Sequence, residues 1–71
     1  MAFFLRWIEK EGGEALTSSG FDTRSAAVNR ACYMLRHFER KPVSVWIEAE
    51  DGRTVMLEPA ITMRCTSMQL L

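Results

Sequence analysis

Net charge is the first thing this sequence lacks, because nine Lys and Arg residues balance nine Asp and Glu residues over 71 positions. Proteins that neutralise many phosphates usually carry a clear basic excess, so binding driven by overall charge is not expected. Apolar runs are short, and none approaches the roughly 18–20 residues of a membrane span. With 48% apolar and 25% charged residues, the composition indicates one small globular domain.

Cysteine and histidine are also scarce. Cys32, Cys65 and the lone His37 are too few ligands for a zinc site, so no metal or cofactor is expected. The first residues lack a basic start and reach Arg6 after only five positions, which is too short for the apolar region of a secretory signal. We therefore expect a cytoplasmic protein in which both cysteines are reduced.

Signals for catalysis are missing as well. Cys32 lies five residues before His37, which places it well round a helix from the histidine, on the apolar side. The Gly12-Gly13 pair lacks the Lys-Ser/Thr that follows in a phosphate-binding loop. The sequence predicts neither an enzyme nor a small-molecule substrate.

Five segments carry secondary-structure signals. Residues 3–10 favour a strand, and residues 14–17 a short returning strand. A helix is expected to start at Asp22 or Thr23, as its cap, and to run to about Arg40, before Pro42. Two alternating strands at 43–50 and 53–58 flank Asp51-Gly52, a strong hairpin signal.

These segments predict an α+β fold of two layers in the order β(β)αββ. One amphipathic helix packs on a three- to four-stranded, mostly antiparallel sheet. Residues 1–58 form the single domain. Residues 59–71 are an apolar C-terminal tail, interpreted as an extra strand or as a segment that docks on a partner.

The layout resembles short uncharacterised bacterial proteins, of the domain-of-unknown-function kind. The similar features are a Phe-rich opening strand at 3–5, the Phe21-Asp22-Thr23 entry to a helix with spaced alanines, and a hairpin over 47–55. The helix entry also looks like that of small antitoxin-like domains, which have a longer Gly-rich hairpin before it. The resemblance implies a ββαββ layout and brings no established activity.

One face of the sheet is expected to stay uncovered. If Val45, Ile47, Val55 and Leu57 meet the helix, Trp46 and Met56 face away. The first strand adds either Phe4 and Ile8 or Phe3, Leu5 and Trp7, depending on its register. Exposed apolar patches of this kind mark interaction surfaces.

The sequence is compatible with three different occupants of that uncovered face. The tail can fold back through Ile61, Met63 and Leu70, two copies can pack face to face, or aromatic rings can stack single-stranded bases. Acidic residues at 48, 50 and 58 would repel a phosphate backbone. The favoured hypothesis is a protein-interaction module whose partner is a second copy, in a homodimer, or another protein. Its interface residues are Phe4, Ile8, Trp46, Met56, Ile61 and Met63.

The alternative hypothesis is nucleic-acid binding through a basic helix face. Its contact residues would be Arg30, Arg36, Arg40 and Lys41. Cations late in a helix are also explained by the helix dipole, so the same residues are compatible with an ordinary solvated surface.

Overall fold

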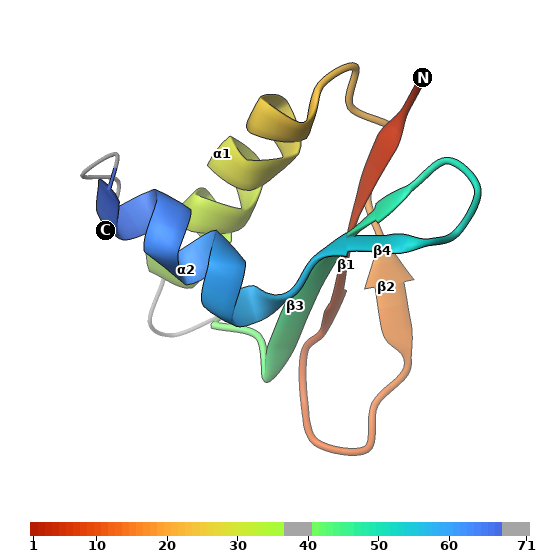
Figure 1. The fold of residues 1–71 in the computed structure, drawn as a ribbon. Coiled ribbons are helices and arrows are strands. Elements are labelled where there is room, and N and C mark those ends of the chain that lie inside the picture. The colour runs from red at the N-terminus through yellow and green to blue at the C-terminus, as the bar shows by residue number, and fades with distance from the viewer. Residues whose placement is uncertain (37–40, 68–71) are drawn as a thin grey trace.

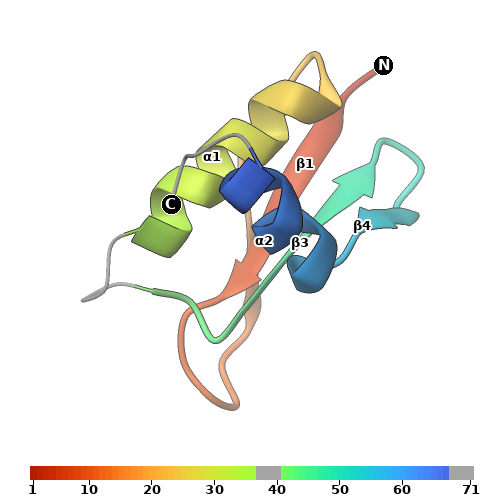
Figure 2. The same ribbon diagram turned by 60° about the vertical axis from the view of Figure 1, so that its left-hand side comes forward.

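The computed structural model describes residues 1–36 and 41–67, in the order ββαββα. The elements are β1 (Phe3–Ile8), β2 (Ala15–Thr17), α1 (Arg24–Arg36), β3 (Ser44–Ala49), β4 (Thr54–Met56) and α2 (Glu58–Ser67). The strands form one antiparallel sheet in the order β2-β1-β3-β4. Both helices lie on the same side of it (Figures 1 and 2). The predicted two-layer α+β fold is confirmed, with a second helix in addition.

The start of α1 distinguishes the two predicted caps. The backbone N–H of Ala26 donates to Thr23 Oγ1 at 3.1 Å, so Thr23 is the N-cap. The apolar face of α1 is buried through Ala27, Val28, Ala31, Cys32 and Leu35. The helix is described to Arg36, and the predicted end near Arg40 lies outside the described residues.

The register of β1 against β3 decides which side chains are covered. Leu5 lies opposite Ile47, and Arg6 lies opposite Trp46. Leu5, Val45 and Ile47 are fully buried beneath the helices. Because side chains alternate along a strand, Phe4 and Ile8 share the other face with Arg6 and Trp46.

An irregularity in the β3–β4 pairing corrects the expected positions on the last strand. Ile47 pairs with Met56, whereas Glu48 pairs with Thr54, which leaves Val55 as an extra residue. The extra residue turns Met56 to the helix side, where it is 9% exposed, and leaves Leu57 64% exposed beyond the strand. The prediction that Met56 faces away and Leu57 faces the helix was therefore wrong.

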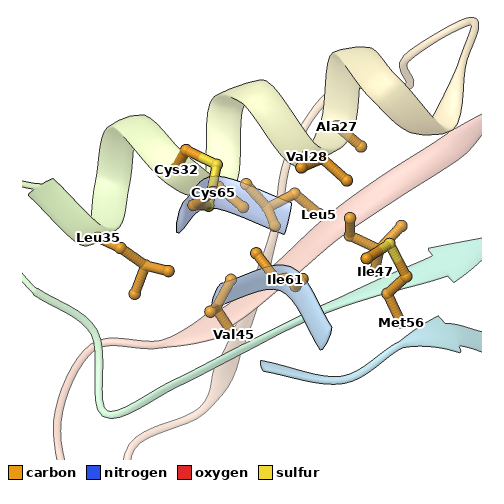
Figure 3. Packing of buried hydrophobic residues seen from close by; sticks show 11 residues of the cluster. Leu5, Ala27, Val28, Cys32, Leu35, Val45, Ile47, Met56, Ile61 and Cys65 are labelled. Carbon is orange, nitrogen blue, oxygen red and sulfur yellow. A yellow bond between two sulfur atoms is a disulfide. The ribbon is translucent and has the colours of Figure 1, made fainter. Parts of the chain in front are cut away.

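The C-terminal segment forms a helix over Glu58–Ser67, which corrects one of its two interpretations, the extra strand. Glu58 and Pro59 begin α2, and both residue types favour the first turn of a helix. Ile61 and Cys65, one helical turn apart, are fully buried. Figure 3 shows Ile61 beside Val45 in the core. The helix packs against α1 and β3 (Figure 2), so it belongs to the same core as the sheet.

The two cysteines form a disulfide, which corrects the expectation that both are reduced. Cys32 on α1 and Cys65 on α2 have Cα atoms 5.7 Å apart, and their bond joins the helices (Figure 3). Sequence spacing gave no sign of this pair, because it depends on α2 lying beside α1. No helix among the described residues is long and apolar enough to cross a membrane.

Candidate functional site

The sheet surface opposite the helices carries the first candidate site. We call it the open sheet face, and it is formed by the side chains of Phe4, Arg6, Ile8, Ser44, Trp46 and Glu48. All six residues are half-buried. Among residues 1–36 and 41–67, both helices pack on the opposite surface (Figure 1). The six side chains therefore form a mixed apolar and polar face with no helix over it.

A polar cluster lies at the centre of the open sheet face. Glu48 Oε2 accepts a hydrogen bond of 2.8 Å from Trp46 Nε1 and forms an ion pair with Arg6 Nη1 at 3.3 Å. The Arg6 guanidinium lies 5.7 Å from the centre of the Trp46 ring. The cluster holds one cation and one anion, so the open sheet face has no net charge. Its largest aromatic group is the Trp46 ring.

The structure places the predicted interface residues in three different regions: the open sheet face, the core and the exposed surface of α2. Phe4, Ile8 and Trp46 lie on the open sheet face. Met56, only 9% exposed, and Ile61, fully buried, belong to the core and not to the open sheet face. Met63 is 74% exposed on α2, which packs on the other side of the sheet. The described part of the tail therefore does not cover the open sheet face, and Leu70 lies outside the described residues.

The predicted basic face is less coherent than the sequence indicated. Arg30, Arg36 and Lys41 are exposed, and Arg40 lies outside the described residues. Arg30 and Arg36 are six positions apart, which turns them about 120° from each other around the axis of α1. Arg30 lies 5.0 Å from the Tyr33 ring, beside a groove. The two helix arginines do not form one patch.

That groove is a second candidate site, which the sequence did not predict. It has a volume of about 790 Å³ and lies between α1, β1 and the loop that follows β2. We call it the α1–β1 groove. The side chains that matter for its chemistry are Trp7, Glu9, Phe21, Arg30, Tyr33 and Met34. The groove exists because α1 packs over β1 while the loop after β2 lies beside them.

Alternation along β1 was the available signal for the groove. Trp7 was predicted to share one face of the strand with Phe3 and Leu5, and the register that decides whether this face is buried was left open. What the sequence could not show is that α1 leaves Trp7 half-buried rather than fully covered. Leu16, opposite Trp7 on β2, is 39% exposed for the same reason.

The described part of the chain contains neither a cluster of metal-ligating side chains nor a free thiol. No group of three metal-ligating side chains forms among residues 1–36 and 41–67. Cys65, which a thiol-dependent reaction would need as a free thiol, is bonded to Cys32. His37 lies outside the described residues.

No family model, curated protein or solved structure matches this chain. The resemblance to short bacterial proteins therefore stays a prediction, and the function rests on the surfaces themselves.

Proposed function

We propose that this protein is an interaction module that works by pairing with a second copy of itself through the open sheet face. The observation that carries the proposal is the position of Trp46 on a sheet surface that neither helix covers, beside Phe4 and Ile8. Tryptophan is among the residues that most often dominate binding at protein interfaces. Burial of one large apolar side chain contributes about 1.5–3 kcal/mol, from which the cost of association is subtracted. A stable dimer therefore needs Phe4, Ile8 and Trp46 together.

Charge favours a second copy as the partner. The open sheet face carries Arg6 and Glu48 as its ionised side chains, already paired with each other. In a twofold dimer the same patch meets itself, so its cation and anion can also lie near those of the other copy. A strongly acidic or basic partner would instead meet a face without net charge.

Size supports the same partner. The Cα atoms extend over 31 × 30 × 18 Å, the flat shape of one helix layer on one sheet. Small domains are marginally stable alone, and a dimer would bury surface that one chain cannot.

The mass of the protein in solution tests the proposal. We expect light scattering after size exclusion to give twice the 8.1 kDa of the chain, and Trp46→Ser to give the monomer with unchanged helical circular dichroism. Ile8→Ser should act in the same direction. Met63→Ser is the matched control, because Met63 is exposed on the other side and should leave the dimer intact. A monomer at millimolar concentration, or a dimer that survives both sheet-face variants, would overturn the proposal.

The cellular location is a separate question, on which the sequence and the disulfide point in opposite directions. Cytosolic thiols are kept reduced, whereas disulfides persist in oxidising compartments. The cytoplasmic location stays a prediction. Alkylation of the protein in freshly lysed cells, followed by mass measurement, tests it: two labelled thiols support the cytoplasm, and none supports an oxidising compartment.

A further inference from the structure

We infer that the Cys32–Cys65 disulfide is a redox switch for the position of α2. When a dithiol reductant breaks this bond, α2 leaves α1 and β3, while α1 and the sheet stay folded. The disulfide joins the two helices, which pack on the side of the sheet opposite the open sheet face (Figure 1). The inference therefore does not rest on the proposed dimer.

The weak attachment of α2 is the first argument. Of its ten residues, Ile61 and Cys65 are buried, Glu58 is half-buried, and the others are exposed. Among residues 1–36 and 41–67, none of the side-chain hydrogen bonds and ion pairs involves α2. Apart from its connection to β4, α2 is thus held by two buried side chains and by the disulfide itself.

The rest of the fold has its own support, which is the second argument. Helix α1 buries five residues and is capped by Thr23, and β1 pairs with β3 along its whole length. Elements with few buried contacts open at a lower free-energy cost than the core. An isolated helix shorter than about 12–15 residues is marginal in water, so α2 loses its structure once it leaves the core. Loss of the disulfide therefore opens α2 before it opens the sheet.

Burial of the sulfur atoms couples the chemistry to this opening. Cys32 is 1% exposed and Cys65 is 0% exposed, so a reductant reaches their bond only when α2 moves away. One thiolate of the dithiol then attacks one of the two sulfurs, and the other cysteine leaves and takes up a proton. The second thiol of the reductant attacks the mixed disulfide and releases the first cysteine. Both cysteines end as thiols, and the dithiol has become a disulfide.

Departure of α2 uncovers apolar surface on the helix side of β3. Val45 and Ile47 are fully buried there, and α2 packs on this strand. Ile61 lies beside Val45 in Figure 3. The reduced form thus presents two thiols and a newly exposed apolar surface, and such surfaces are sites of association.

Hydrogen exchange of the full chain, measured by mass spectrometry with and without dithiothreitol, tests the inference. We expect the amides of α2 to exchange at least about tenfold faster after reduction, and those of β1 and β3 to stay at least about tenfold slower than those of α2. The double variant Cys32→Ala/Cys65→Ala should show the same pattern without reductant. Unchanged exchange in α2 would overturn the inference. A single common rate in all elements of the reduced protein would overturn it as well, because the disulfide would then hold the whole fold.

The rate of reduction gives a second test with a matched control. Ile61→Ala removes the other buried side chain of α2 and should speed reduction by dithiothreitol at least about tenfold, as measured by alkylation of the released thiols. Met63→Ala, at an exposed position of the same helix, should leave the rate within about twofold. Equal rates in Ile61→Ala and the unmodified chain would mean that the sulfurs are reached without opening of α2, against the inference. Trp46→Ser should be reduced as the unmodified chain is, so failure of the dimer and failure of the switch are separate results.

Discussion

Trp46 and Glu48 lie two residues apart on β3, and the indole N–H of Trp46 donates a hydrogen bond of 2.8 Å to the Glu48 carboxylate. The same carboxylate oxygen meets Arg6 from the neighbouring strand. One acidic group thus holds both the ring and the cation of the open sheet face. Side chains fixed before binding lose less conformational freedom when a partner covers them.

Removal of Glu48 tests how much this cluster stabilises the fold. We expect Glu48→Ala to lower the free energy of unfolding by about 1–2 kcal/mol, because it leaves the Trp46 N–H and Arg6 without their acceptor. Glu50→Ala, at an exposed position on the same hairpin, should change it by less than about 0.5 kcal/mol. Urea unfolding followed by tryptophan fluorescence measures both. Equal effects at the two positions would contradict this role of Glu48.

The cap of α1 offers a second matched pair. Thr23→Ala should destabilise the protein by about 1 kcal/mol, because the Ala26 N–H loses its acceptor at the helix start. Asp22→Ala should cost less, since Asp22 acts there only through its charge near the helix dipole. Thermal unfolding followed by circular dichroism compares them. A larger loss for Asp22→Ala would show that the cap is assigned to the wrong residue.

Local signals were enough to predict most of the architecture. Asp51 and Gly52 specified the last hairpin: Asp51 Oδ1 accepts from Arg53 N–H, and Gly52 adopts a φ of +88° that favours glycine. The alternation of Val45 and Ile47 with Trp46 placed the tryptophan on the open side. These features depend on residues close together in the chain.

Non-local features were missed for the same reason. The orientation of Met56 depends on how β4 pairs with β3, and one extra residue reverses it. The helix over 58–67 was hidden because Ile61, Met63 and Cys65 alternate as in a strand, although Ile61 and Cys65 also have helical spacing. The disulfide and the groove both depend on where the helices lie over the sheet.

The burial of α2 leads to a third prediction. Ile61→Ala should lower the free energy of unfolding by about 2–5 kcal/mol, because it leaves a cavity among Val45 and its neighbours. Met63→Ala, two positions along the same helix and 74% exposed, should change it by less than about 0.5 kcal/mol. Denaturant titration of both variants is the measurement. Similar small effects would mean that residues 58–67 do not dock on the core.

The disulfide gives the last prediction. Cross-linking Cys32 to Cys65, 33 positions apart, restricts the unfolded chain and should contribute about 3–4 kcal/mol by the chain-entropy relation. The double variant Cys32→Ala/Cys65→Ala should lose about that much in denaturant unfolding, plus a small packing term because both side chains are buried. Reductant should destabilise the unmodified protein to a similar extent and leave the double variant unchanged. If reductant has no effect on the unmodified protein, the two helices are held together by packing alone.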